Sequence, residues 1–215
     1  ATRDYNISSL SGNITCIGFP TYRGTSSNAI KTARKWIQMT DGSWKYRTLQ
    51  GYVESRWLKL GRNWWYFNED GRMHTGWFLY GNRWYYRYPD GTYLKNGWGF
   101  IGNIWYLFDA NGMMLTGWQM KNGVYYYMNG DGKMQTGWLL YNNTWYYLSE
   151  SGAMVTGWIT LGDKAYYLGG DGGMLTGWQN IDGQIYYLYP DGHKAVNEVI
   201  DTFYVDHDGI WRKPQ

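Results

Sequence analysis

Near-copies of one short segment fill most of this chain, and this repetition limits the fold more than any other feature of the sequence. The segment Gly137 to Leu148 reads GWLLYNNTWYYL, and copies of it lie before and after it. The first tryptophan of each copy, here called the anchor, recurs 20 or 21 residues apart, at Trp57, Trp77, Trp98, Trp118, Trp138, Trp158 and Trp178. Trp36 lies 21 residues before Trp57 and marks a weaker first copy. Because a unit of this length cannot bury a core alone, the copies must stack on their neighbours.

Each copy is predicted to form a β-hairpin. Turn signals such as Asn122-Gly123 stand between two short runs that are rich in aromatic residues. With the turn at this place, the anchor pairs with the residue nine positions later, and the residue seven positions later shares the anchor's face. Trp138, Trp145 and Tyr147 are therefore expected on one face and Tyr146 on the other. The predicted fold class is all-β, a repeat β-solenoid of stacked β-hairpins.

The second half of each copy is predicted to be a loop with fixed landmarks. A closing glycine follows the anchor by 14 positions, with Asp or Asn before it in all but one copy, at Gly71, Gly91, Gly112, Gly132, Gly152, Gly172 and Gly192. Such pairs are turn signals. Two positions after it lies the methionine position, occupied by Met73, Met114, Met134, Met154 and Met174, and by Tyr93 and Lys194 in the other two copies.

Three regions are expected from these patterns. Residues 1–35 are poor in rings and form an N-terminal segment or cap, in which a short helix from Ser27 to Trp36 is predicted. Residues 36–193 form the repeat array. Residues 194–215 form a C-terminal capping hairpin, because Glu198 stands where an anchor is due and an array needs an atypical last unit.

The composition narrows the class of protein. The chain has 15 Trp and 23 Tyr but only 6 Phe, and rings with a polar atom suit half-exposed surfaces. A formal net charge of +3 forms no basic stripe, so nucleic acid is not expected as a partner. The single cysteine excludes an internal disulfide and a cysteine-rich metal site. No apolar run approaches the ~20 residues that cross a bilayer, so no transmembrane segment is expected.

No group of residues predicts catalysis. The histidines His74, His193 and His207 stand singly, without the paired spacing of a metal site, and Cys16 has no histidine near it in the N-terminal segment. The loop carboxylates are explained by turn formation, and nothing selects a glycosidase pair among them. The protein is therefore not expected to be an enzyme, and no cofactor, no metal and no catalytic residue are expected.

The repeated rings are the remaining candidates for a function. Packing between hairpins alone would explain an aromatic stripe, but the ring seven positions after the anchor, here called the second ring, varies separately from the anchor. It is present at Trp64, Trp84, Trp105, Tyr125 and Trp145 and absent at Ala165 and Ile185. Ring faces attract cations by roughly 0.5 to 2 kcal/mol, and aromatic cages suit quaternary ammonium. The pattern thus predicts a ligand whose recognised part is cationic or flat.

These residues resemble a known family. The runs Thr-Gly-Trp and Trp-Tyr-Tyr-Leu, the following Gly and Met, and the tail Asp208-Gly209-Ile210-Trp211 are similar to the choline-binding repeat modules of pneumococcal and related surface proteins and autolysins. The resemblance covers about residues 57–212, with Trp36 to Tyr46 as a weaker copy. It implies hairpins stacked into a left-handed β-solenoid, with choline of teichoic acids between neighbours. In that family two rings come from one hairpin and a third from the next, with a methionine nearby.

Carried over residue by residue, the resemblance implies five cages. Each takes an anchor, a second ring and a tyrosine of the next hairpin, and three of them also take a methionine. The implied sets are Trp57, Trp64 and Tyr86; Trp77, Trp84 and Tyr106; Trp98, Trp105, Tyr127 and Met134; Trp118, Tyr125, Tyr147 and Met154; and Trp138, Trp145, Tyr167 and Met174. The second set departs from the family pattern, because Leu107 stands where tyrosine is expected. Cages on Trp158 and Trp178 lack the second ring and are expected to fail.

The resemblance implies a non-catalytic protein that binds choline or phosphocholine of teichoic and lipoteichoic acids. Such a protein is secreted and held non-covalently at the bacterial cell surface. The roles that the resemblance suggests there are those of an adhesin and of a modulator of wall hydrolases. Host surface proteins are suggested as further partners. If it is exported, this sequence is expected to be the mature form, because no charged and then apolar leader opens it. Two alternatives stay open: a repeat module that binds polysaccharide such as glucan, and a regulator or fragment of a wall hydrolase that acts through residues 1–35.

Overall fold

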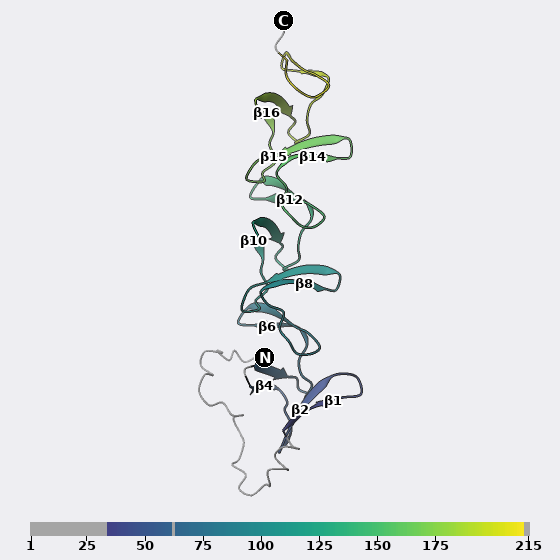
Figure 1. Cartoon of the computed structure of the whole chain (residues 1–215), viewed down its shortest axis with the longest axis vertical. Helices are drawn as coiled ribbons and strands as arrows, with labels where there is room; N and C mark the ends of the chain where they lie inside the picture. The colour runs from purple at the N-terminus through teal and green to yellow at the C-terminus, as the bar shows by residue number, and fades with distance from the viewer. Residues whose placement is uncertain (1–33, 62, 213–215) are drawn as a thin grey trace. The chain divides into compact units, whose positions relative to one another are not determined.

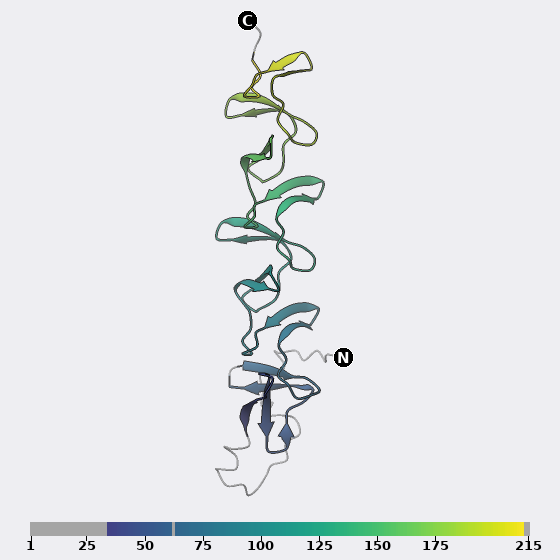
Figure 2. The same ribbon diagram turned by 90° about the vertical axis from the view of Figure 1, so that its right-hand side faces the viewer.

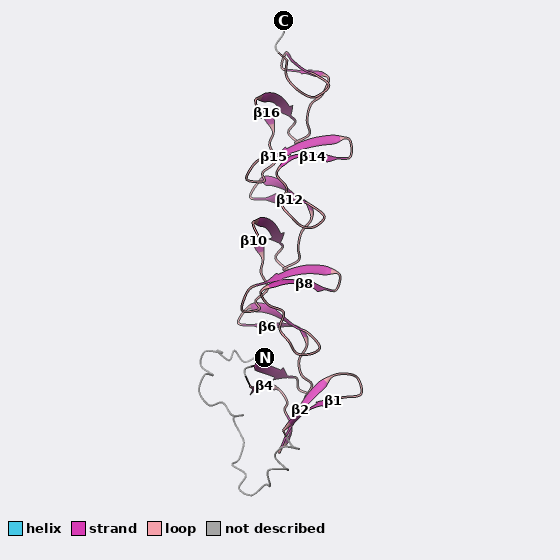
Figure 3. Cartoon of the chain, in the orientation of Figure 1, coloured by secondary structure: helices cyan, strands magenta, loops and turns pink. Residues whose placement is uncertain are grey.

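The computed structural model describes residues 34–61 and 63–212, and every element in this part of the chain is a β-strand (Figure 3). The strands are β1 (Lys35–Gln38), β2 (Trp44–Thr48), β3 (Gly51–Tyr52), β4 (Arg56–Leu60), β5 (Asn63–Phe67), β6 (Gly76–Tyr80), β7 (Arg83–Arg87), β8 (Gly97–Ile101), β9 (Ile104–Phe108), β10 (Gly117–Lys121), β11 (Val124–Met128), β12 (Gly137–Tyr141), β13 (Thr144–Leu148), β14 (Gly157–Leu161), β15 (Lys164–Leu168), β16 (Gly177–Ile181), β17 (Gln184–Leu188), β18 (Glu198–Ile200) and β19 (Phe203–Val205). None of the described residues belongs to a helix of the length and apolarity that would cross a membrane. The prediction of an all-β fold of repeated hairpins is confirmed.

The chain divides into two compact units, each a run of hairpins. The first unit holds the described residues up to Gly99 together with Phe108–Met114, and contains the three-stranded sheet β1-β2-β3 and the hairpins β4-β5 and β6-β7. The second unit holds Phe100–Leu107 and the described residues from Leu115 onward. Its hairpins are β10-β11, β12-β13, β14-β15, β16-β17 and β18-β19. The boundary falls in the hairpin of β8 and β9 (Figure 1).

The register of the hairpins is the one expected from the turn signals. Trp118 pairs with Tyr127 and Trp138 pairs with Tyr147, so these anchors lie opposite the residue nine positions later. Asn122 and Gly123 both have positive φ, 53° and 80°, as a tight two-residue hairpin turn of type I′ requires. Short strands joined by such turns alternate with longer loops (Figure 2).

Backbone hydrogen bonds fasten loops of the array to the hairpin of the preceding copy. The N–H of Met174, in the loop after β15, donates to the carbonyl of Trp145 in β13 over 2.7 Å. The N–H of Met154 donates in the same way to Tyr125 over 2.8 Å. The methionine position of one copy is thereby held beside the second ring of the preceding copy. Within each unit, this contact brings side chains of successive copies together.

One position in the core recurs from copy to copy: the last residue of the second strand of a hairpin is buried. In the second unit Met128, Leu148, Leu168 and Leu188 are completely buried there. Burial of such a side chain contributes about 1.5 to 3 kcal/mol, so these few side chains need the packing of the surrounding rings as well. In the first unit Arg87 occupies the equivalent place and is 1% exposed.

The closing glycines support the methionines of the preceding copy. Gly192 has a φ of 87°, and a Cβ added to it would lie 2.2 Å from Sδ of Met174. Gly172 stands in the same relation to Met154, with 2.4 Å. Glycine is therefore required twice over, because φ is in the left-handed region and because the methionine lies against the backbone. The turn signal noted in the sequence also has this packing role.

The predicted helix from Ser27 to Trp36 is wrong at its end, because Lys35 and Trp36 lie in β1. Trp36 pairs with Tyr46, and its ring lies 4.8 Å from that of Trp65. These contacts outweigh the weak helix propensity of the segment. The rest of that prediction, like nearly all of the predicted N-terminal segment 1–35, lies outside the described residues.

The last hairpin is shorter than the others. β18 and β19 have three residues each, and the turn between them has positive φ at Asp201 and Thr202. Val205 is completely buried at the place that Leu188 fills one copy earlier. The capping role of residues 194–215 stays a prediction.

Candidate functional site

A cavity of about 310 Å³ in the second unit is lined by Trp138, Trp145, Tyr166, Met174 and Asp191. The anchor Trp138 and the second ring Trp145 come from one hairpin, with ring centroids 6.3 Å apart and planes at 88°. Tyr166 comes from the next hairpin, and its ring lies 5.1 Å from that of Trp138 at 69°. Three steeply inclined rings thus surround an opening in which Trp145 is 42% exposed. This volume is at the lower end of the range for small-ligand pockets.

The tyrosine that completes this cage is Tyr166, whereas Tyr167 was expected there. Tyr167 pairs with its own anchor Trp158, with ring centroids 5.1 Å apart. Successive side chains of a strand point to opposite faces, and the face that meets the preceding hairpin carries the tyrosine eight positions after the anchor. Tyr146 meets Trp118 in the same way, with centroids 5.0 Å apart.

The charge of this cage comes from Asp191, two hairpins beyond Trp138. The Asp191 carboxylate contacts Nδ1 of His193 and lies 3.4 Å from Nζ of Lys164. Burial raises the pKa of Asp191, but the hydrogen bonds with His193 and Lys164 outweigh burial and lower the pKa below its ordinary value. The carboxylate is therefore ionised at neutral pH and places a negative charge at the opening.

The first unit contains a cage of the same plan, lined by Trp36, Trp44, Trp65, Met73 and Asp90, with a volume of about 240 Å³. The rings of Trp36 and Trp44 lie 6.4 Å apart at 88°, and those of Trp36 and Trp65 lie 4.8 Å apart at 69°. These values nearly equal those of the Trp138 cage. Both cages are therefore built in the same way, each from five equivalent positions that belong to three successive copies.

The Trp36 cage was missed in the sequence because its second ring is displaced by one position. Trp44 follows Trp36 by eight residues and pairs with Gln38, which makes it the equivalent of the second ring in a hairpin with a longer turn. Aligning the copies with a one-residue insertion would have shown this. Hydrogen bonds from Thr92 lower the pKa of Asp90, so this cage also carries an ionised carboxylate.

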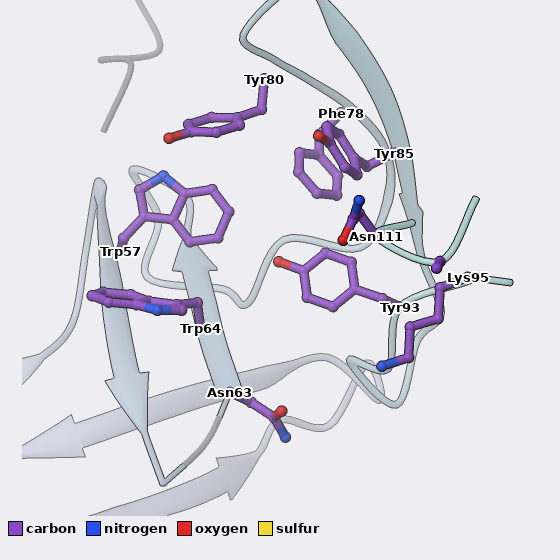
Figure 4. Close-up of a pocket in the computed structure, with 10 residues that line it drawn as sticks. Trp57, Asn63, Trp64, Phe78, Tyr80, Tyr85, Tyr93, Lys95 and Asn111 are labelled. Atoms are coloured by element: carbon purple, nitrogen blue, oxygen red, sulfur yellow. The ribbon is translucent and has the colours of Figure 1, made fainter. Parts of the chain in front are cut away.

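A third cavity, of about 320 Å³, lies in the first unit (Figure 4). It is lined by Trp57, Asn63, Trp64, Phe78, Tyr80, Tyr85, Tyr93, Lys95, Ala110 and Asn111. Tyr85 takes the place at which Tyr86 was expected, and Tyr86 pairs with its own anchor Trp77. Phe78 stacks on Tyr85 with ring centroids 5.4 Å apart, and its ring lies 6.2 Å from that of Trp57.

The copy anchored by Trp158 holds a lysine of the protein itself. Ala165 replaces the second ring, and Lys194 occupies the methionine position. Nζ of Lys194 lies 5.3 Å from the ring centroid of Trp158 and 5.7 Å from that of Tyr186. It also donates to the carbonyl oxygen of Asp208 over 2.6 Å. The two rings are 4.9 Å apart at 69°, as in the open cages, so the ammonium group lies within cation–π distance of both.

The last anchor, Trp178, gains rings from the C-terminal hairpin. A cavity of about 240 Å³ is lined by Trp178, Ile185, Phe203 and Trp211. Phe203 lies 5.8 Å from Trp178 at 86°, and Trp211 lies 6.0 Å from Phe203 at 77°. Trp211 stands two positions after Gly209, at the methionine position. A ring at this position compensates for the missing second ring, which the sequence comparison between copies did not anticipate.

The comparisons with known proteins agree with this geometry. Residues 53–98, 115–156 and 155–198 match the choline-binding repeat family. The chain belongs to the choline-binding repeat family. A cell wall binding repeat matches residues 96–114 between these segments. Membership associates the chain with choline and with the bacterial cell wall. Among curated proteins no match is found.

Solved structures of choline-binding proteins are similar over most of the chain. Choline binding protein F from Streptococcus pneumoniae is 37% identical, with a TM-score of 0.68 over 79% of this chain and 61% of that protein. CbpJ from Streptococcus pneumoniae TIGR4 is 34% identical, with a TM-score of 0.70 over 83% of this chain and 69% of that one. The choline-binding domain of CbpL from Streptococcus pneumoniae is 33% identical, with a TM-score of 0.58 over 85% and 98%. The chain thus spans 61% of the length of choline binding protein F.

The other rings expected in choline cages are only partly brought together. Trp77 and Trp84 lie 6.4 Å apart at 86°, like the rings of the complete cages, while their expected partner Tyr106 belongs to the second unit and is buried. Trp98 belongs to the first unit, and Trp105, Tyr127 and Met134 belong to the second. The grouping of these residues stays a prediction.

Trp118 has ring neighbours in the second unit that differ from those expected. Its ring lies 5.0 Å from Tyr146 and 6.2 Å from Tyr141, whereas the expected partner Tyr147 lies against Trp138. The other two expected members of this set are Tyr125 and Met154, and the N–H of Met154 donates to the carbonyl of Tyr125 over 2.8 Å.

One cluster near the C-terminus has the composition of a metal site. Asp206, His207 and Asp208 bring ligand atoms within 4.8 Å of one another. The Asp206 carboxylate, however, accepts hydrogen bonds from the side chain of Arg212 and the N–H of Ile210. These hydrogen bonds explain the position of the Asp206 carboxylate in the turn, and we assign no metal ion to the cluster.

Proposed function

We propose that the chain is a non-catalytic module that binds choline groups in aromatic cages formed between successive copies. The observation that carries the proposal is Lys194, whose ammonium group lies against the rings of Trp158 and Tyr186. A cation of the protein itself thus occupies the place where the open cages offer space. The open cages on Trp36 and Trp138 keep the same ring geometry and have a methionine in place of the lysine.

The chemistry of the open cages favours a quaternary ammonium group. Three ring faces attract a cation by roughly 0.5 to 2 kcal/mol each at partly exposed sites. The group has no N–H, so it loses nothing by meeting rings and a thioether in place of hydrogen-bond acceptors. Asp90 and Asp191 add a negative charge at the opening without having to accept a hydrogen bond.

Several cages on one chain suit a polymer that carries many choline groups. Linked engagement raises retention by roughly 10² to 10⁴ over a single site where the spacing permits it. The proposed ligand is therefore the phosphocholine of teichoic and lipoteichoic acids, which would hold the protein non-covalently at the outer surface of a bacterium. We further propose that an exported chain acts there as an adhesin or as a modulator of wall hydrolases.

The test is a choline titration followed by the indole N–H signals in NMR spectra of the full chain. We expect the Trp145 signal to shift saturably with choline, and Trp145→Ala to weaken binding at the Trp138 cage by about 2- to 30-fold, the equivalent of one ring face. Leu140→Ala is the matched control, because Leu140 pairs with Trp145 in the same hairpin, is 53% exposed and does not line the cavity.

Two results would refute the proposal. The first is a spectrum in which no indole signal of the cages moves at high choline concentration while the fold is intact. The second is an equal effect of Trp145→Ala and Leu140→Ala on choline binding. A titration with soluble glucan oligosaccharides tests the alternative ligand, which should shift the same signals if polysaccharide is recognised.

A further inference from the structure

The cavity around Trp57 and Trp64 differs in charge from the other two open cages. The acidic residue at the opening of the Trp36 and Trp138 cages is Asp90 or Asp191, and Asn111 takes the equivalent place here. Among the described residues that line this cavity, none carries a carboxylate. The nearby carboxylate of Asp109 stabilises the turn that it belongs to, because its Oδ1 accepts hydrogen bonds from the N–H groups of Asn111 and Met113 over 2.8 Å each. The carboxylate that lines the other two open cages is therefore missing from this one.

One cationic side chain lines the same cavity, and two more contact rings that line it. Lys95 lines it directly and is exposed, and Nζ of Lys59 lies 5.7 Å from the ring centroid of Trp64. A third cation, Arg87, lies behind Tyr93, with its guanidinium 4.0 Å from the Tyr93 ring centroid. Arg87 is 1% exposed and donates to the carbonyl of Trp64 over 2.9 Å, and its Nη1 has no partner.

Burial lowers the pKa of Arg87 and raises the pKa of Tyr93. An arginine titrates so far above neutral pH that it still carries its charge. The Tyr93 phenol stays protonated, so it adds no negative charge to the cavity. Tyr93 occupies the methionine position, and Figure 4 shows its hydroxyl pointing toward the two indoles. A hydroxyl donor thus replaces the thioether that faces the ligand in the other cages.

Donors and rings occupy different sides of this cavity. In Figure 4 the indoles of Trp57 and Trp64 lie at one end, while Lys95 and the amide of Asn63 lie along another side. The rings offer faces to an ammonium group, and the ammonium, amide and hydroxyl groups offer donors to an anion. A bare cation would meet the repulsion of three cationic side chains without an acidic residue to offset it.

We propose that the Trp57 cage binds the zwitterionic phosphocholine group in preference to bare choline, with the ammonium on the indoles and the phosphate beside Lys95, Asn63 and the Tyr93 hydroxyl. The Trp36 and Trp138 cages take the ammonium group whether or not it carries a phosphate. The inference rests on the proposed function, since it assigns the form of choline that one cage selects.

The experiment compares choline chloride with phosphocholine as titrants of the full chain, cage by cage, through the indole N–H signals. Trp64 reports the cavity in question and Trp145 reports the reference cage. We expect the Trp64 signal to saturate at a phosphocholine concentration about two- to fivefold lower than that of choline, as one partly exposed charge pair contributes. The Trp145 signal should show no such preference.

Variants assign the preference to the charges. Lys95→Gln should remove it, and Asn111→Asp should favour choline by placing a carboxylate where the other cages have one. Lys133→Gln is the control, because it removes the same charge from a half-buried position beside Asp131 in the second unit. Phosphatidylcholine vesicles, in place of phosphocholine, test whether a lipid headgroup is a source of the same chemistry.

The possible results are distinct. Equal saturation of the Trp64 signal by the two titrants, or a preference that persists in Lys95→Gln, overturns the inference and leaves the proposed function in place. A Trp145 signal that responds to neither titrant overturns the proposed function. Unchanged signals of the remaining indoles show that each variant is folded.

Discussion

The occupied cage on Trp158 allows a gain of function to be predicted from two substitutions. Trp158 and Tyr186 already have the ring geometry of an open cage, with centroids 4.9 Å apart at 69°. Two features separate this copy from the Trp138 copy: Ala165 stands at the second-ring position, and the Lys194 ammonium lies against the rings. The double substitution Ala165→Trp and Lys194→Met gives both positions the residue types of the Trp138 cage.

The expected magnitude follows from the contacts. Lys194→Met removes the competing cation and one hydrogen bond to Asp208, and leaves a two-ring site that binds choline weakly. An indole at position 165 adds about 0.5 to 2 kcal/mol, equivalent to about 2- to 30-fold in affinity. Ala165→Trp alone adds a ring to a cage that is still filled. The two substitutions are therefore strongly non-additive, and only the pair adds one choline per chain.

Equilibrium dialysis with labelled choline counts the bound ligand in the wild type, in both single variants and in the double variant. Thermal melting of each protein controls for folding. The reasoning is refuted if the folded double variant binds no more choline than the wild type. It is equally refuted if Ala165→Trp alone supplies the additional site, since Lys194 would then not block it.

Three further predictions concern packing, the C-terminal cavity and acid stability. Gly192→Ala should lower the free energy of unfolding in urea by about 1–2 kcal/mol, because alanine is strained at positive φ and its Cβ would displace Met174; a stability equal to that of the wild type would show that the methionine moves freely. Trp211→Ala should reduce the bound choline by one per chain in equilibrium dialysis, and an unchanged count would exclude the Trp178 cavity as a site. Hydrogen bonds from Ser43 and Arg72 lower the pKa of Asp41 from 3.8 to about 2, so the folded state favours the ionised carboxylate. Its stabilisation is complete above pH 3.8 and is lost as the pH falls toward 2, and thermal melts of Asp41→Asn should therefore depend less on pH in this window than those of the wild type.

The period, the hairpins and their register could be predicted from the sequence because they depend on local spacing. The turn signal at Asn122-Gly123 fixes which residues face each other, and Trp118 indeed pairs with Tyr127. The shared face of Trp138 and Trp145 follows from the two-residue period of a strand, and the two rings meet at 6.3 Å. These relations need no knowledge of how one copy meets the next.

The contacts between copies could not be predicted in the same way. Whether Tyr166 or Tyr167 completes a cage depends on which face of a hairpin meets its predecessor, and that is set by loop bonds such as Met174 N–H to the Trp145 carbonyl. To predict that Asp191 lines the Trp138 cage, one would need to know the path of the two loops between them. The lysine in the Trp158 cage had a visible signal, because Lys194 departs from the methionine of the other copies.

Because three successive copies contribute to one cage, the residues of each cage are encoded in three different repeats of the gene. Asp90 serves a pocket whose anchor, Trp36, is encoded more than two repeats upstream. Recombination that deletes or inserts one repeat would therefore create junction pockets with new combinations of rings and charge, in addition to changing their number. If the proposed cages bind as described, a change in repeat number would alter which form of choline the array retains without any point substitution within a repeat.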